Sequence, residues 1–370
     1  MRIGHFADTH LGFQRWGYPD RDGFNQRETD IYKVFNEAIE QMLDRKVEAV
    51  IHAGDLFENH HPPTRAIEVA LDGLKRLINA GIPVVAVPGN HSTPRNPMAA
   101  HVFGLLERFG VKTIHGGPGQ VRVGDLMVTG IPHDHRPDTL REQIRAAQPD
   151  PNAAFNVLVL HVGTEGLAGD GGRETAPVEL EPEMLNEGSD FTYLALGHLH
   201  GHFRPTPNAC YSGSLERLTF GDRAMQKGWV EVDLAAAGKP GFLRLHEVDP
   251  RAFVHPPPVD ASSSADLLPL VEAAIAGRSL EGAMVRIELV GVDQGAWRSF
   301  DRAAWAKKTE GALHVEVTAG YAGAAPSAAA ATVELHEFLR SFVPKGVDAD
   351  QVIQRAEEFM RQAAELLPDA

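Results

Sequence analysis

Short apolar runs alternate with amphipathic stretches in the amino-terminal part of the chain. Continuous runs rich in Val, Ile and Ala occupy residues 3–7, 49–53 and 84–87, with the length of buried strands. Between them, apolar residues recur every three or four positions over 23–43 and 64–79, which predicts two helices with one buried face each. This alternation of strand and helix predicts a largely parallel sheet with right-handed crossovers.

The pattern then changes to shorter apolar runs that are separated by glycines. We expect strands over 111–114, 120–123, 126–131, 157–160, 193–196, 228–234 and 241–248. The first three of these runs are expected to form hairpins of a second sheet, and the last two to complete the same core. The fold class expected from the whole pattern is α/β.

The carboxyl-terminal third of the chain has a different texture. Three consecutive prolines at 256–258 predict a stiff linker. Beyond it we expect a helix over 265–276, a strand over 283–290, a helix over 299–307 and a strand over 312–318. An alanine-rich stretch predicts a tether, and two amphipathic helices follow it. The expected divisions are 1–250 for the main domain, 251–321 for a small α/β domain, 322–332 for the linker and 333–370 for the terminal helices.

Length and composition narrow the class of protein. A chain of 370 residues is long enough for two or three domains of about 100–200 residues each. Hydrophobic residues make up 43% of it, and the single cysteine, Cys210, cannot form a disulfide within the chain. No apolar stretch approaches the roughly 20 residues needed to cross a bilayer. We therefore expect a protein of the reducing cytoplasm without a membrane segment.

The net charge of −15 argues against a protein that coats nucleic acid indiscriminately. It does not exclude a nuclease, because carboxylates can be metal ligands and local basic patches can act against the overall field. The arginines considered for such patches are Arg15, Arg21, Arg27 and Arg95. For each of them, the simpler interpretation is a solvated surface side chain.

Polar signatures follow five of the expected strands, at the point where each strand ends. They are Asp8-x-His10, Gly54-Asp55, Gly89-Asn90-His91, the solitary His161 and Gly197-His198-Leu199-His200. Ligands bind at the carboxyl ends of strands in α/β sheets, so these side chains are expected to converge. The glycines that precede ligands are expected to let the backbone turn sharply without a Cβ clash.

The candidate donors among them are two carboxylates, one amide and four imidazoles, without a thiolate: Asp8, Asp55, Asn90, His10, His161, His198 and His200. Such oxygen and nitrogen donors suit Mn, Fe or Zn better than Cu(I) or an iron–sulfur cluster. Seven donors are too many for one tetrahedral zinc, so they favour two ions that share a bridge. Asp8 and His10 are two positions apart, and so are His198 and His200. On an extended chain, side chains two positions apart point to the same side, so both members of each pair can reach one metal centre.

In these motifs and their order, the sequence resembles the calcineurin-like metallophosphoesterases over at least residues 1–250. Two further stretches, Asp8-Thr9-His10-Leu11-Gly12 and the run from Tyr211 to Arg217 followed by Phe220-Gly221, resemble the SbcD-type nuclease subunit of double-strand-break repair. The resemblance implies a four-layer core of two sheets flanked by helices. It also implies that the later α/β module is a capping domain and that the terminal helices bind an SbcC-type, SMC-like coiled-coil ATPase.

The resemblance also implies roles for individual residues. Asp8, His10 and His200 would hold one ion, Asn90, His161 and His198 the other, with Asp55 bridging them and His91 as the catalytic histidine that binds no metal. The implied cofactor is a pair of Mn²⁺ ions, with Fe²⁺, Zn²⁺ or Mg²⁺ as alternatives. Two such ions lower the pKa of a shared water and clamp the oxygens of an in-line phosphoryl displacement.

Two positions depart from the family pattern. Ser92 follows His91 where many relatives have Asp, which leaves open how the imidazole of His91 is oriented. Glu58 stands where some relatives have a His that contacts substrate, a duty that His60 or His61 could take. His60, His61 and Arg95 are the candidate DNA contacts.

The expected function is a metal-dependent nuclease that processes DNA ends or single-stranded regions in double-strand-break repair. The resemblance implies 3'-5' exonuclease and single-strand endonuclease activity, an SbcC-type partner, a homodimer and a cytoplasmic, nucleoid-associated location. One alternative is a phosphoesterase for a cyclic nucleotide or nucleotide conjugate. Another is a noncatalytic tether for DNA ends, which the presence of His91 disfavours, because a purely structural metal site needs no additional acid. No base specificity is expected, since the chain has no recognisable DNA-reading motif.

Overall fold

The structure of the chain is a computed structural model that describes residues 1–94, 96, 100–164, 179–180, 185 and 190–321. It divides into two compact units. The first contains residues 1–255, 277–286 and 309–316, and the second contains the remaining residues from 256 onward. Each unit is described by itself.

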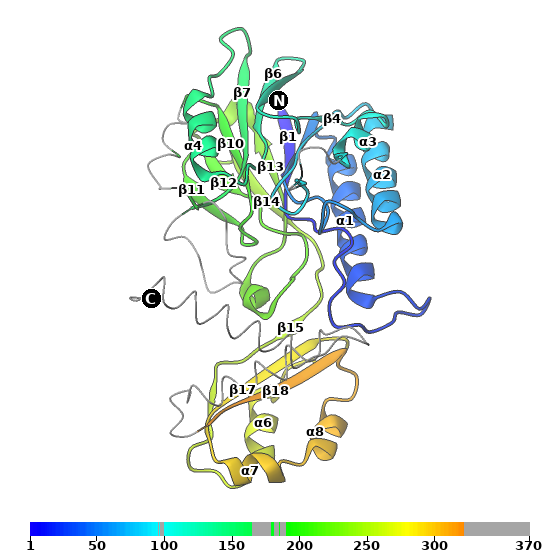
Figure 1. The fold of residues 1–370 in the computed structure, drawn as a ribbon, viewed down its shortest axis with the longest axis vertical. Coiled ribbons are helices and arrows are strands. Elements are labelled where there is room, and N and C mark those ends of the chain that lie inside the picture. Colours follow the sequence, from blue (N-terminus) through cyan, green and yellow to red (C-terminus); the bar gives the residue numbers. More distant parts are fainter. Residues whose placement is uncertain (95, 97–99, 165–178, 181–184, 186–189, 322–370) are drawn as a thin grey trace. The chain divides into compact units, whose positions relative to one another are not determined.

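Six strands form the first sheet of the larger unit, in the order β14-β13-β1-β2-β3-β4 (Figure 1). The strands are β1 (Arg2–Phe6), β2 (Ala49–Ala53), β3 (Val84–Val87), β4 (Lys112–Thr113), β13 (Gly228–Asp233) and β14 (Leu243–Glu247). The pairs from β1 to β4 are parallel, as the sequence predicts, while β13 and β14 add antiparallel neighbours beside β1. The prediction that residues 111–114 start the second sheet is wrong, because β4 pairs with β3.

Two long helices join the first three strands. They are α1 (Gln26–Arg45) and α2 (Thr64–Asn79). The predicted start of the first helix at residue 23 is wrong because Asn25 caps the helix, its side chain accepting hydrogen bonds from the N–H groups of Arg27 and Glu28. Lys46 ends it in a left-handed conformation.

The second sheet has the order β11-β12-β10-β7-β6-β5. Its strands are β5 (Gly119–Val123), β6 (Leu126–Ile131), β7 (Phe155–His161), β10 (Tyr193–Gly197), β11 (Phe203–Thr206) and β12 (Ala209–Tyr211). The predicted hairpin is present as the antiparallel pair β5–β6, but the four central strands from β12 to β6 are parallel. Parallel order brings the carboxyl ends of β7 and β10 to the same edge.

Alternating side chains of each strand build a four-layer core, which confirms the predicted architecture. Residues of β1, β2 and β3 that face one way pack with α1, α2 and the short helix α3 (Phe103–Glu107). Residues that face the other way, such as Ile51 and Val85, pack against Val157 and Tyr193 of the second sheet. The outer face of that sheet, including Leu158, is covered by α4 (Pro137–Ala146). The period-two pattern thus decides which layer each side chain joins.

A further four-stranded sheet has β17 (Met284–Val292) paired with β15 (Phe253–Val254), β16 (Val259–Asp260) and β18 (His314–Tyr321). The helices α6 (Leu268–Ile275), α7 (Gln294–Ser299) and α8 (Arg302–Lys308) lie in the smaller unit. The sequence predicts α6, α8 and the long strands β17 and β18, but it does not predict α7. Its start is fixed by Asp293, whose side chain accepts from the N–H groups of Gly295 and Ala296.

The predicted linker at 322–332 and the predicted helices at 333–370 lie outside the described residues. Within the part of the chain that the structure describes, no helix combines the length and apolar character needed to span a membrane.

Candidate metal centre

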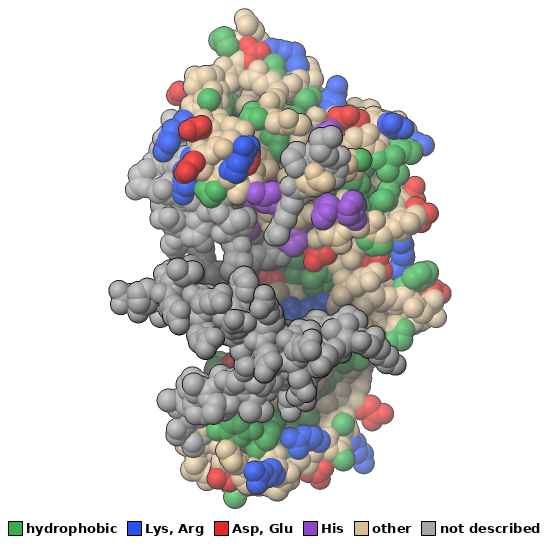
Figure 2. Space-filling model, viewed as in Figure 1, with side chains coloured by type: hydrophobic (Ala, Val, Ile, Leu, Met, Phe, Trp, Pro, Cys, Tyr) green, Lys and Arg blue, Asp and Glu red, His purple; other side chains and the backbone are tan. Residues whose placement is uncertain are grey.

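All five polar signatures converge where β1, β2 and β3 of one sheet and β7 and β10 of the other end. The side chains of Asp8, His10, Asp55, His161, His198 and His200 are all buried there. Figure 2 shows histidine side chains gathered on one face of the molecule. The convergence follows from the parallel order within each sheet, because the two sheets pack with these strand ends on the same side.

Three groups of side chains have ligand atoms within 4.8 Å of one another. One group is Asp8, His10 and His200, a second is Asp8, Asp55 and His161, and a third is His10, Glu58 and His91. Asp8 belongs to two groups, and the bridging role predicted for Asp55 stays a prediction. The closeness of so many donors at one strand edge makes it a candidate site for divalent metal.

Asn90 and His198 complete the set. The amide oxygen of Asn90 lies 3.0 Å from His161 Nε2 and 3.2 Å from His198 Nδ1. The backbone N–H of His198 donates to both carboxylate oxygens of Asp8, at 2.9 and 3.0 Å. The structure therefore brings together all seven residues that the sequence nominates as ligands.

The backbone at the centre is strained. Asp8, His10, Asp55 and His198 have φ values of 51°, 50°, 52° and 98°. Such left-handed conformations are uncommon for residues with a Cβ and persist only where the surroundings hold them, typically at functional sites. Only two other non-glycine residues in the described part of the chain, Trp16 and Lys46, share this feature.

The glycines that precede candidate ligands, Gly54, Gly89 and Gly197, act in two different ways. Gly54 has a φ of 100°, so it provides the sharp turn that the sequence predicts. Gly89 and Gly197 do not have positive φ, and the prediction of a sharp turn is wrong there. They are needed for close approach, because a Cβ on Gly89 would collide with the Asp55 carboxylate and one on Gly197 with the Ala53 carbonyl.

Glu58 orients His10. Its Oε2 lies 2.7 Å from His10 Nδ1, so that nitrogen donates to the carboxylate. The other ring nitrogen of His10, Nε2, is buried and has no hydrogen-bond partner within the described residues. A buried nitrogen lone pair that is left without a partner is costly, and a bound cation would satisfy it. On this test the donor set fits a metal.

When no metal is bound, the electrostatics of the centre favour a charged Asp55 beside a protonated His161, while burial raises the pKa of Asp8. Burial opposes protonation of His161, but Asp55 and Asp8 outweigh it and raise its pKa to about 9. Burial likewise opposes ionisation of Asp55, yet His161 and His10 hold its pKa well below the usual range. His161 Nε2 lies 2.9 Å from Asp55 Oδ2. A cation would replace the protons on these rings.

His91 is held by the backbone rather than by its neighbour in sequence. Its Nδ1 donates to the Glu58 carbonyl at 2.7 Å, and its N–H donates to Asp55 Oδ1 at 2.9 Å. Because a carbonyl can only accept, Nδ1 carries a proton. Ser92 instead turns toward the Phe57 carbonyl, 3.4 Å away. The departure at Ser92 therefore leaves the orientation of His91 intact.

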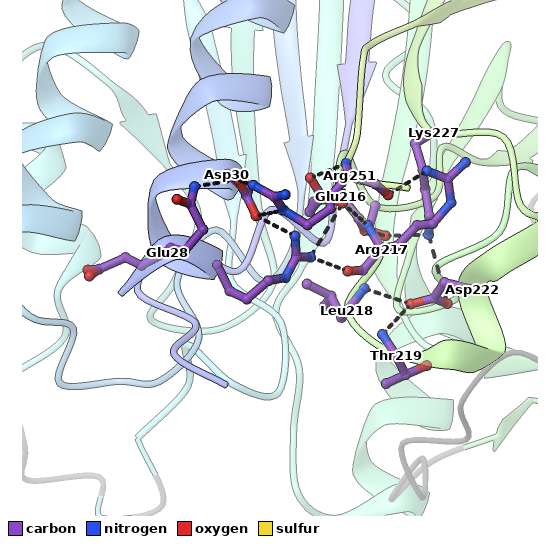
Figure 3. A network of polar contacts seen from close by, with 12 residues as sticks. Glu28, Asp30, Glu216, Arg217, Leu218, Thr219, Asp222, Lys227 and Arg251 are labelled. Carbon is purple, nitrogen blue, oxygen red and sulfur yellow. Dashed lines mark hydrogen bonds and ion pairs between the residues drawn. The ribbon is translucent and has the colours of Figure 1, made fainter. Parts of the chain in front are cut away.

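A buried pair of charges supports the loop that carries His200. Lys227 Nζ donates to the His200 carbonyl at 2.9 Å and to Ser214 Oγ at 2.8 Å. Asp222 lies 3.8 Å from Lys227 Nζ (Figure 3) and 3.8 Å from His200 Nδ1. Burial lowers the pKa of Lys227 to about 8, although Asp222 and Glu216 oppose the shift. Sequence reasoning missed Lys227 and Asp222, although Asp222 directly follows the Phe220-Gly221 stretch, because neither residue ends a strand that carries a candidate ligand.

The same network corrects the interpretation of Arg27 as part of a surface patch. Its side chain is only 1% exposed, donates to Asp30 at 2.6 Å and lies 3.4 Å from Glu216. Arg251 pairs with the same Asp30 and donates its N–H to Glu216 (Figure 3). Arg27 therefore neutralises buried carboxylates and is not available to a nucleic acid.

The candidate DNA contacts lie apart from these groups. His60 and His61 have ring centroids 4.3 Å apart and line a pocket with His101 and His115. Arg95 lies outside the described residues.

The model of the calcineurin-like phosphoesterase family matches residues 1–202, more than half of the chain. This chain belongs to that family. The match ends just beyond His200, so it contains all eight residues nominated for the centre. A calcineurin-like phosphoesterase has the four-layer core described above, and the resemblance inferred from the motifs is confirmed.

Relatives of this calcineurin-like phosphoesterase include proteins named DNA double-strand break repair protein Mre11. The one from Methanococcus maripaludis is 29% identical over 208 residues, 54% of this chain and 52% of that protein. The one from Haloferax volcanii is 30% identical over 298 residues, 78% of this chain and 61% of that protein. The chain thus spans about half to three fifths of the length of these relatives. Among solved structures, a dimetal phosphatase from Danio rerio has a TM-score of 0.35 and 12% identity, over 62% of this chain and 91% of that one.

Proposed function

We propose that this chain is a two-metal phosphodiesterase that hydrolyses DNA at ends or in single-stranded regions during double-strand-break repair. The observation that carries the proposal is the buried cluster of carboxylates, imidazoles and one amide, in which His10 keeps an unsatisfied nitrogen. Similarity to repair proteins of the Mre11 type supports DNA as the substrate.

In this proposal Asp8, His10 and His200 hold one ion, Asn90, His161 and His198 hold the other, and Asp55 bridges them. The pair is Mn²⁺, and Fe²⁺, Zn²⁺ or Mg²⁺ are the alternatives to be compared. When bound, two such ions supply Lewis acidity and a nucleophile that is active at neutral pH. Glu58 fixes the tautomer of His10 so that Nε2 presents its lone pair.

His91 is the proposed general acid. With Nδ1 committed to the Glu58 carbonyl, Nε2 can carry the proton that the departing sugar oxygen needs. The hydrogen bond from the His91 N–H to Asp55 keeps this imidazole next to the metal-binding carboxylate. A positioned acid of this kind typically contributes a factor of about 10²–10⁴ to the rate.

The wider assignments rest on the family resemblance. They are 3'-5' exonuclease and single-strand endonuclease activity, an SbcC-type ATPase bound through residues 333–370, a homodimer and a location at the nucleoid of the cytoplasm. The charge of −15 favours a DNA contact that is confined to a small surface rather than spread over the whole molecule.

The test compares three substrates with the purified full chain in Mn²⁺ or Mg²⁺. We expect hydrolysis of linear DNA and of a chromogenic phosphate bis-ester, and little hydrolysis of a cyclic nucleotide. Metal content is measured on the same preparation, with two ions per chain expected. Hydrolysis of the small diesters without any cleavage of DNA would reject the proposal in favour of a small-molecule phosphoesterase.

A further inference from the structure

A second histidine-rich site lies outside the metal centre. It is a pocket of about 610 Å³ whose lining includes His60, His61, His101, His115 and Arg108, which we call the histidine pocket. The rest of the lining is largely apolar and includes Ile67 and Leu105. The volume is within the range of about 300–1,000 Å³ that is usual for sites of small organic ligands.

Three separate segments build this pocket. The loop between β2 and α2 supplies His60 and His61, the region of α3 supplies His101 and Arg108, and the segment that follows β4 supplies His115. The rings of His101 and His115 have centroids 4.9 Å apart and are inclined by 40°. The rings of His60 and His61 have centroids 4.3 Å apart and are inclined by 47°, so the pocket contains two pairs of closely packed, tilted rings.

The arrangement does not suit a metal ion. Among the described residues, the groups of three or more ligand atoms within 4.8 Å of one another all belong to the metal centre. No carboxylate belongs to the lining of the histidine pocket. Glu107 approaches His115 Nε2 at 3.4 Å without being part of that lining.

The charge of the histidine pocket favours an anion with an aromatic part. Burial, helped by His115 and His60, lowers the pKa of His101 to about 4, so this ring is neutral at pH 7. A neutral imidazole offers a flat face for stacking without the cost of burying a charge. Arg108 is exposed and permanently charged, and a guanidinium suits a phosphate.

The histidine pocket is connected to the metal centre through one short loop. Glu58 contacts both His10 and His91, and His60 follows it two residues later. One loop therefore supplies residues to both sites.

We propose that the histidine pocket holds one unpaired nucleotide of the substrate strand, with its base against the imidazole rings and a phosphate at Arg108. The inference rests on the proposed function for the identity of the strand. Stacking of a base on an aromatic ring is sequence-tolerant, since every base has a π-face. The pocket therefore gives preference for frayed or single-stranded DNA without reading its sequence.

The first experiment separates this pocket from the chemistry. His115→Ala and Arg108→Ala are made in the metal-loaded full chain, and steady-state kinetics are measured on a single-stranded oligonucleotide and on the phosphate bis-ester. We expect KM for the oligonucleotide to rise about tenfold in each variant, the size typical of one lost stacking contact. Hydrolysis of the bis-ester, which has no nucleobase for the pocket to bind, stays within about twofold.

Two matched controls sharpen the result. His115→Phe keeps a flat ring and is expected to keep the KM for the oligonucleotide near that of the parent. Lys112→Ala removes a cation that is exposed on neighbouring β4 but does not line the pocket, and it is expected to have no effect. An equal loss on both substrates, or an unchanged KM in both alanine variants, would overturn the inference.

The second experiment does not depend on DNA cleavage. Binding of deoxyadenosine 5'-monophosphate and of deoxyadenosine to the full chain is followed by NMR of the histidine side chains. We expect saturable shifts of the rings of His101 and His115 with both probes, and a weaker affinity for the monophosphate in Arg108→Ala. No saturable shift with either probe overturns the inference, while a bound nucleotide in a protein that does not cleave DNA overturns only the proposed function.

Discussion

The metal centre and the histidine pocket are both rich in imidazoles, but the two sites treat them in opposite ways. In the centre, His10 and His161 each face a carboxylate within 3 Å, and the pKa of His161 is raised to about 9. In the pocket, His101 and His115 face each other, and the pKa of His101 is lowered to about 4.

This difference teaches that the partners of a histidine, rather than the number of histidines, decide what a cluster can bind. Carboxylates hold imidazoles in place and favour positive charge, which a metal then replaces. At His101, burial and the neighbouring rings of His115 and His60 keep the imidazole neutral. The first arrangement suits cations, and the second suits an aromatic anion.

The largest expected effect follows from removing a carboxylate of the centre. Asp55→Asn takes away the charge that faces His161, although its amide oxygen can still accept from the His91 N–H. We expect loss of at least one bound metal per chain and a fall in turnover of more than about 10³-fold. Elemental analysis and bis-ester hydrolysis measure both. His115→Ala serves as the control, and loss of metal from it as well would erase the contrast between the two sites.

His91→Ala should separate binding from chemistry. The variant keeps both metals, because His91 is proposed as an acid and not as a ligand, while turnover falls by about 10²–10⁴-fold. Elemental analysis and single-turnover kinetics check this prediction. If metal were lost in proportion to activity, His91 would be a ligand.

Glu58→Gln should have a smaller effect. Glutamine at this position can still accept from His10 Nδ1 but has lost the negative charge. We expect metal affinity to fall by about 10–100-fold, the usual consequence of losing the carboxylate behind a metal-binding imidazole. Competition with a chelator measures the change. Glu107→Gln, which alters the carboxylate beside His115, is the matched control and should leave metal affinity unchanged.

The smallest expected effect concerns stability against pH in metal-free protein. His161 has a higher pKa when folded, so its contribution is complete below about pH 6.5 and is lost as pH rises through about 9. For this fully buried ring the loss amounts to about 3 kcal/mol at most. His101 has a lower pKa when folded, so its contribution is complete above about pH 6.5 and is lost as pH falls through about 4. Imidazole NMR titrations and urea unfolding curves should show midpoints on opposite sides of neutrality; two midpoints near 6.5 would contradict the comparison.

Much of the main domain could be predicted from the sequence, because the spacing of apolar residues and the residues that end each element agree there. The strands β2 and β3 and the helix α2 lie where the pattern predicts them. The assignment of β4 to the second sheet failed, because a two-residue strand carries no pattern that tells which neighbour it joins. The parallel centre of the second sheet was missed for a similar reason, since short apolar runs look alike in hairpins and crossovers.

The candidate ligands could also be predicted, since each follows a strong strand signal. What the sequence could not give was the support around them. Glu58 was noticed only as a departure from the family pattern, whereas the structure shows it holding His10 and, through its carbonyl, His91. Lys227, the residue before β13, donates to the carbonyl of His200. This contact depends on the packing of segments that are distant in the sequence. The spacing of residues along the sequence does not indicate such contacts.

The pairing of β1 with β13 has a consequence for synthesis. β1 leads to Asp8 and His10, yet one of its two neighbours arrives only with residues 228–233. A nascent chain, or a truncated one that stops before this point, leaves β1 as an open edge that can pair with other chains. Shortened forms made for biochemistry should therefore extend through Glu247, the last residue of β14.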